Sequence, residues 1–264
     1  MRENHWADVY LERIGAGRPA RADAEALREL QLRHLMTVPF ENLSIHLGED
    51  IVLEEEKLVD KIVTGGRGGF CYELNGAFAA LLRRLGFRVT LLQARVFGDG
   101  GLLGIPYDHM AIRVGTDDGT GPWLADVGFG DHALRPLALD DRAEQRDPSG
   151  VFRLQVAPGG DLDLVRDGSP QFRLDLRPRV VADFRAGAWY HRTSPDSHFT
   201  RSLVCSRCTA TGRVTLGGRT LVTTVRGERH ETPLDTDAEV LAAYREHFGL
   251  SLSRVPVVRR NPNA

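Results

Sequence analysis

One cysteine, followed later in the chain by a histidine and an aspartate, could form a nucleophilic site. Cys71 comes directly after the glycine-rich stretch TGGRGGF, and an amphipathic segment with helical periodicity follows it. A cysteine at the start of a helix is favoured as a thiolate, because the helix dipole and the free N–H groups stabilise negative charge. The same N–H groups could bind an oxyanion that forms during acyl transfer. Cys71 is therefore the candidate nucleophile.

A thiolate nucleophile needs a base that takes its proton and a third group that fixes the tautomer of that base. His109 lies in the strand-like run YDHMAIRV, and Asp126 ends the next apolar run, in LADVGFG, before a glycine turn. If these runs form neighbouring antiparallel strands, His109 and Asp126 lie close together and the Cys71 helix can pack against them. Each residue alone has an ordinary structural interpretation, but their joint order predicts a catalytic triad of Cys71, His109 and Asp126.

The segments that position these residues change type along the chain. Apolar residues at helical spacing predict helices over residues 6–14, 23–36, 53–63 and 71–85. Pro39 makes a helix improbable through VPFENLSIHLG. From Arg88 onward, short apolar runs separated by Gly, Pro and Asp predict β-strands, and Thr236 and Glu239 form a capping box before a final helix. Helices first, then strands, then a mixed part indicate an α+β protein.

The bulk composition excludes several classes of protein. The 264 residues are 42% hydrophobic and 27% charged, as in ordinary globular proteins. A net charge of −2 gives no reason to expect a nucleic-acid partner, and no apolar run approaches the ~20 residues of a membrane span. The N-terminus mixes charged and apolar residues, unlike a signal peptide. With three cysteines, an odd number, we expect a cytoplasmic protein.

Cys205 and Cys208 have the spacing of a zinc or redox pair. A structural zinc site needs four ligands, and the sequence contains no second such pair. Residues three apart on a strand also face opposite sides of the sheet. We interpret both cysteines as inert thiols and predict no metal site. Four further histidines lack ligand spacing and are assigned no chemistry: His191, His198, His230 and His247.

The segments RGGFCYELN, HMAIRV and DVGFG closely resemble the arylamine N-acetyltransferase family, as do VPFENL and SPDSHF. The resemblance runs in register from Tyr10 to Thr224. It implies a papain-like or transglutaminase-like cysteine-triad fold in three parts. These parts would be a helical bundle carrying the cysteine (1–87), a β-barrel carrying the histidine and aspartate (88–181), and a C-terminal α/β lid (182–264).

The resemblance also implies a ping-pong reaction. Acetyl-CoA, as a substrate and not a tightly bound cofactor, would acetylate Cys71, and an arylamine, arylhydroxylamine or hydrazine would then take the acetyl group. His109 would be the base and Asp126 would orient its ring.

Family-matched positions imply the substrate contacts. The apolar, aromatic acceptor slot would be lined by Phe40, Tyr72, Val96, Phe129 and Phe199. Gly128 and Gly130 would let backbone N–H groups approach the CoA pyrophosphate. We expect Arg67 and Glu73 to pair with each other and brace the site.

Three other functions are compatible with the same residues and differ in the acyl donor, the acyl acceptor or the reactivity of Cys71. A macrolactam-forming amide synthase would have the same triad but an acyl-carrier donor, and a cysteine peptidase would release the acyl group to water. A binding protein that has kept the fold would have an unreactive Cys71. The sequence allows a homodimer.

Overall fold

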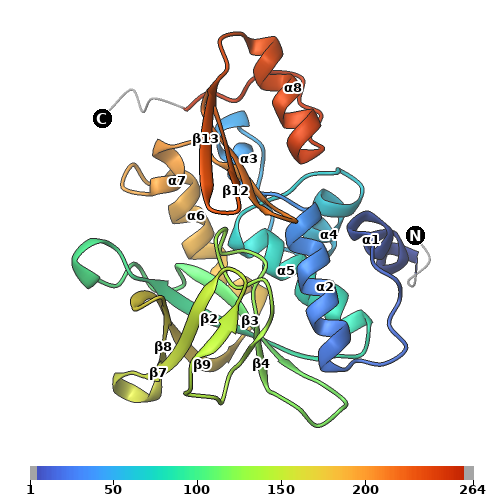
Figure 1. Ribbon diagram of the computed structural model, residues 1–264, viewed down its shortest axis with the longest axis vertical. Coiled ribbons are helices and arrows are strands. Elements are labelled where there is room, and N and C mark those ends of the chain that lie inside the picture. Colours follow the sequence, from blue (N-terminus) through green and yellow to red (C-terminus); the bar gives the residue numbers. More distant parts are fainter. Residues whose placement is uncertain (1–4, 259–264) are drawn as a thin grey trace.

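The computed structural model describes residues 5–258 (Figure 1). The ends of the first and third predicted parts, residues 1–4 and 259–264, lie outside the described residues. The fold is α+β, with an eight-stranded and a five-stranded antiparallel sheet. In the part of the chain that the structure describes, no helix has the length and apolarity to cross a membrane.

The four helices predicted before residue 88 are confirmed. They are α1 (His5–Ile14), α2 (Ala24–Thr37), α4 (Glu55–Val63) and α5 (Cys71–Arg84). Asp23 caps α2 as expected, because its carboxylate accepts the N–H of Ala26 at 2.9 Å. Helix α5 is buried along nearly its whole length and packs against α4 on one side and the barrel on the other. The nucleophile candidate therefore lies on the most deeply buried helix of this part.

The prediction that residues 38–48 contain no helix is wrong. The segment forms β1 (Phe40–Glu41) and then the short helix α3 (Leu43–Leu47). Proline disfavours helical backbone mainly in the residue before it, so Pro39 does not restrict a helix that begins at Leu43. The Glu41 carboxylate accepts the N–H of Leu43 at 2.9 Å and so satisfies one of the first free donors of α3.

The eight-stranded sheet curls into a nearly closed barrel, seen in the lower half of Figure 1. Its strands follow the order β5-β4-β3-β2-β9-β8-β7-β6. The two edge strands meet where the Gln145 side chain bonds the backbone N–H and C=O of Ala138, at 2.7 and 2.9 Å. The strands are β2 (Arg88–Val96), β3 (His109–Gly115), β4 (Trp123–Ala125), β5 (Leu137–Ala138), β6 (Gln145–Asp147), β7 (Gly150–Val156), β8 (Leu162–Arg166) and β9 (Ser169–Arg179).

The C-terminal part joins a five-stranded sheet to three helices. In the order β1-β10-β11-β12-β13, β1 pairs with β10 through Phe40 and Ser206, so an N-terminal segment completes this sheet. Thr236 and Glu239 cap α8 as predicted. The elements are α6 (Arg185–Thr193), α7 (His198–Arg201), β10 (Cys205–Thr209), β11 (Gly212–Gly217), β12 (Thr220–Val225), β13 (Glu228–Pro233) and α8 (Asp237–Phe248).

Candidate active site

Cys71 is the first residue of α5, as the glycine-rich turn before it predicts. Its side chain is nearly buried, and Sγ lies 3.9 Å from the backbone oxygen of Asp108. Glu73 closes the start of the helix by accepting the N–H of Phe70 at 3.2 Å. The thiol therefore sits at the positive end of a 14-residue helix whose first N–H groups have no partner within the helix.

The structure brings His109 and Asp126 together with Cys71. Strands β3 and β4 are antiparallel neighbours, with Ile112 opposite Ala125, so Asp126, just after β4, comes near the start of β3, where His109 lies. His109 Nε2 lies 2.6 Å from Asp126 Oδ2, and both side chains are buried. Cys71 and His109 line the same pocket, and the Cys71 side chain is close enough to raise the pKa of the His109 ring. Since Nε2 faces the carboxylate, Nδ1 is the nitrogen left to face the sulfur.

The charges of this pair depend on each other. Burial alone disfavours a protonated imidazole, but the Asp126 carboxylate and the Cys71 thiol outweigh it and raise the pKa of His109. Burial would likewise raise the pKa of Asp126, yet His109, His132 and the Asn75 amide lower it. Asp126 is thus a carboxylate near neutral pH, and His109 can accept and keep a proton next to the thiol.

Asn75 links α5, strand β3 and the turn after β4, and the sequence motifs alone did not mark it as a site residue. Its side-chain amide donates to Asp126 Oδ1 at 2.8 Å and to the Met110 carbonyl, and its oxygen accepts the N–H of Val127 at 2.9 Å. Asn75 stands one helical turn after Cys71, on the same face of α5. That spacing, within the quoted stretch RGGFCYELN, is the signal that could have identified it.

Gly128 is required by close packing of the turn after Asp126 against the start of α5. A Cβ at this position would lie 2.8 Å from the Cα of Cys71 and 2.9 Å from the Asn75 amide nitrogen. Carbon atoms do not approach so closely, so any side chain here would push the turn away from the helix. The packing role is independent of the contact with CoA that the family resemblance implies.

A pocket of about 600 Å³ opens onto Cys71 and His109. Five of the predicted substrate and CoA contacts line it: Phe40, Val96, Gly128, Phe129 and Phe199. Gly130 and Tyr72 are not among the lining residues. Tyr72 is fully buried, and its hydroxyl donates to the Tyr107 carbonyl at 2.6 Å.

Aromatic rings lie around the candidate triad. Phe129 meets the His109 ring edge-on at 5.1 Å between ring centres, and the rings of Phe40 and Phe199, which both line the pocket, lie 6.0 Å apart. Flat apolar molecules fit such a slot through stacking and burial. The pocket therefore favours a planar aromatic ligand close to the thiol.

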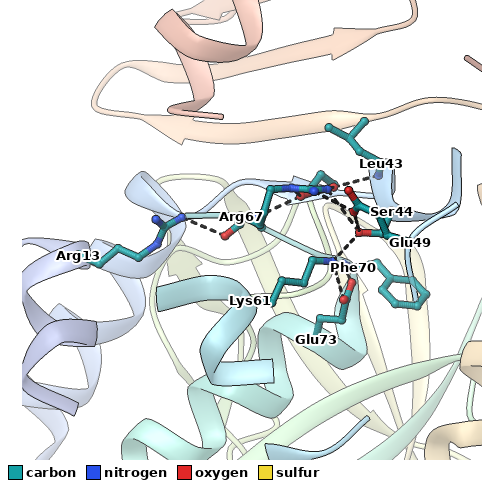
Figure 2. A network of polar contacts seen from close by, with 10 residues as sticks. Arg13, Leu43, Ser44, Glu49, Lys61, Arg67, Phe70 and Glu73 are labelled. Carbon is teal, nitrogen blue, oxygen red and sulfur yellow. Dashed lines mark hydrogen bonds and ion pairs between the residues drawn. The ribbon is translucent and has the colours of Figure 1, made fainter. Parts of the chain in front are cut away.

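The expectation that Arg67 and Glu73 pair with each other is wrong. Arg67 forms a two-pronged ion pair with Glu41 at 2.8 and 2.9 Å. Figure 2 shows its further ion pair with Glu49. Glu73 instead meets Lys61 of α4 at 2.6 Å. The reason is that Glu73 lies in the first turn of α5, which packs on α4, whereas Arg67 precedes the helix and reaches β1.

Together these ion pairs hold the loop before Cys71. The Glu41 carboxylate also accepts the N–H of Gly68 at 3.2 Å, and the Arg67 carbonyl accepts from Arg13 of α1 at 2.9 Å. Burial raises the pKa of Glu73 despite Lys61, whereas the two nearby cations lower the pKa of Glu41 against the effect of its burial. The network braces the start of α5 without lining the pocket.

Cys205 and Cys208 lie apart from this site. They point to opposite faces of β10, as predicted, and pack in different hydrophobic clusters. Burial raises the pKa of both thiols, which keeps them protonated. Across residues 5–258, no group of three or more His, Cys, Asp or Glu side chains is placed to hold a metal ion.

The sequence and the fold are both similar to known proteins. Residues 23–257 match the family model described as N-acetyltransferase. The arylamine N-acetyltransferase of Mycolicibacterium smegmatis is 35% identical over 254 residues, which cover 92% of this chain and 91% of the relative.

Two solved structures share the fold. The arylamine N-acetyltransferase from Salmonella typhimurium aligns with a TM-score of 0.87 and 29% identity, over 97% of this chain and 95% of the other. The Mycobacterium marinum arylamine N-acetyltransferase in complex with CoA aligns with a TM-score of 0.83 and 30% identity, over 92% of each chain.

Proposed function

The chain belongs to the arylamine N-acetyltransferase family and is an acyltransferase, and on that premise we propose that it acetylates arylamines, arylhydroxylamines or hydrazines from acetyl-CoA through an acetyl-Cys71 thioester. The observation that carries the mechanism is the buried chain of contacts from the Cys71 thiol through His109 to Asp126, at the end of an aromatic pocket. Acetyl-CoA acts as a substrate that enters and leaves. A likeness to a relative solved with CoA supports this choice of donor.

In the first half-reaction, His109 takes the thiol proton and Sγ of Cys71 attacks the carbonyl carbon of acetyl-CoA. The first N–H groups of α5 stabilise the oxyanion. The C–S bond to CoA then breaks, and the CoA sulfur leaves with the proton held by His109. Asp126 keeps the ring in one orientation throughout and stabilises its charged form.

In the second half-reaction, the amine nitrogen attacks the same carbonyl carbon, now bonded to Cys71. His109 takes one proton from the nitrogen, the C–S bond to Cys71 breaks, and the sulfur recovers that proton. A thioester suits both steps, since it exchanges with another thiol and acylates an amine. Phe40, Val96, Phe129 and Phe199 line the slot in which the acceptor ring lies.

The wider organisation belongs to the same proposal. We assign the chain a papain-like order of nucleophile, base and acid, with part boundaries after residues 87 and 181, and CoA contacts at Gly128 and Gly130. We place the reaction in the cytoplasm, in keeping with three cysteines that are all free.

An intact-mass measurement tests the proposal. The protein is mixed with acetyl-CoA and no acceptor, beside a Cys71→Ser control. We expect an acetyl-sized mass gain in the wild type only, discharged when an arylamine such as anisidine is added. A wild-type protein whose cysteine is readily alkylated, yet gains no acetyl group, would refute acetyl-CoA as the donor and favour an amide synthase.

A further inference from the structure

A second chain of hydrogen-bonding side chains lies in the wall of the same pocket, beginning at Asp108. The backbone carbonyl of Asp108 lies 3.0 Å from the Tyr72 hydroxyl, which it shares with the nearer Tyr107 carbonyl, and 3.9 Å from the Cys71 sulfur. Its carboxylate accepts the N–H of Val96 at 3.1 Å and lies 2.9 Å from Nε2 of His191. Asp108 thus contacts the nucleophile through its main chain and helix α6 through its side chain.

His191 connects Asp108 to the segment that carries Phe199. Its Nδ1 lies 3.0 Å from Oγ of Ser197, and Oγ accepts the N–H of Phe199 at 3.2 Å. Because the Ser197 oxygen accepts from Phe199, its single hydrogen is free to donate to Nδ1, which leaves the ring proton on Nε2 to be donated to Asp108. Every polar atom of the chain then has a partner, and both His191 and Ser197 are buried.

The ring of His191 also fixes the ring of Phe199 directly. The two rings meet edge-on at 5.2 Å, and Phe199 meets Phe70, the residue before Cys71, edge-on at 5.8 Å. On the other side, the Phe199 carbonyl accepts from the Asn42 amide at 3.0 Å. Phe199 is therefore held at three points: its carbonyl by Asn42, the residue before α3, its N–H by Ser197, the residue before α7, and its ring by His191 of α6.

We propose that His191, held between Asp108 and Ser197, is a positioning residue that fixes Phe199 against an aromatic acceptor and so determines specificity in the second half-reaction. The inference rests on the proposed function. A flat acceptor must present its nitrogen to the thioester at a defined angle, and small misplacements of the groups that orient it slow the reaction. The flexible arm of acetyl-CoA and an acceptor too small to reach Phe199 do not depend on that ring.

The test separates the two half-reactions and two acceptors. Acetylation of Cys71 by acetyl-CoA, and discharge of the acetyl-enzyme by anisidine or by hydrazine, are timed by quenched flow and intact mass for wild type and His191→Ala. His230→Ala is the control, since His230 lies exposed on β13. We expect anisidine discharge to slow about tenfold in His191→Ala, with loading and hydrazine discharge unchanged.

Two other results would overturn the inference about His191. Unchanged anisidine discharge, or equal slowing with both acceptors, would show that His191 does not select the aromatic acceptor. Ser197→Ala, which loses the bonds to His191 and to the Phe199 N–H, replaces His191→Ala if that variant does not fold, and should show the same selective loss. Absence of acetyl-Cys71 in the wild type would instead remove the proposed function, whereas normal loading with unchanged discharge removes this inference alone.

Discussion

Replacing Asp126 with asparagine exchanges one carboxylate oxygen for an NH₂ group of similar size. The group that faces His109 then donates a hydrogen bond instead of accepting one. Asp126 Oδ1 accepts from the Asn75 amide and from the N–H of Gly128, both at 2.8 Å. Only an oxygen can receive these two donors, so the asparagine oxygen must take this place and its NH₂ must face His109. The NH₂ needs an acceptor, which forces Nε2 to give up its proton and places the ring proton on Nδ1, facing Cys71. The ring can then no longer accept the thiol proton.

The size of the effect follows from this tautomer. The corresponding substitution in a serine triad lowers turnover about 10⁴-fold. A thiol ionises more readily than a hydroxyl, so we expect a smaller loss here, about 10²- to 10³-fold in the rate of Cys71 acetylation, or roughly 3–4 kcal/mol in activation free energy. Because the fold keeps the same shape and loses one charged hydrogen bond, we expect the free energy of unfolding to fall by about 1–3 kcal/mol.

The assay is single-turnover acetylation followed by intact mass, with urea unfolding measured on the same samples. Asp163→Asn serves as the matched control, because Asp163 lies on β8 in an ion pair with Arg173. A near wild-type acetylation rate in Asp126→Asn would refute the argument. So would an equal loss of rate in the control.

Three further perturbations test the surroundings of the site. Lys61→Met leaves the buried Glu73 without its cation and should lower the free energy of unfolding in urea by about 2–4 kcal/mol, with part of the loss recovered when Glu73→Gln is added. The raised pKa of His109 stabilises the fold fully below about pH 6.5, and this stabilisation is lost as the pH rises through the folded-state pKa. The difference in free energy of unfolding between wild type and His109→Gln should therefore shrink from about pH 6 into the alkaline range. A difference that grows with pH would contradict a raised pKa of His109. Gly128→Ala should cost about 1–3 kcal/mol and slow acetylation, whereas Gly217→Ala, where a Cβ meets its nearest atom at 3.7 Å, should do neither.

The sequence predicted those parts of the site that depend on residues close together in the chain. A cysteine after a glycine-rich turn indicates a helix start, and two short apolar runs close in the chain predict neighbouring strands. The structure shows both, with α5 beginning at Cys71 and β3 antiparallel to β4. The catalytic roles of Cys71, His109 and Asp126 and the part boundaries stay predictions until they are measured.

What the sequence did not reveal depends on distant partners. His191 lies 83 residues from Asp108, and neither residue belongs to a local pattern that points to the other. Arg67 was paired with the nearest acid in the motif, but packing of α5 on α4 directs Glu73 to Lys61. Strand β13 was missed because all of its residues are exposed, which leaves no alternation of apolar and polar side chains.

The way Asn75 ties α5 to the turn after β4 has a consequence for how the protein becomes active as it is made. A ribosome completes the cysteine and Asn75 well before the histidine and the aspartate, so a nascent chain that ends before β3 carries a thiol without a base. The hydrogen bonds of Asn75 to Met110, Asp126 and Val127 can form only when both strands are present. Under the proposed mechanism, neither half of the chain alone would bring Cys71 together with its base, and reactivity would arise only when the barrel docks onto the helix.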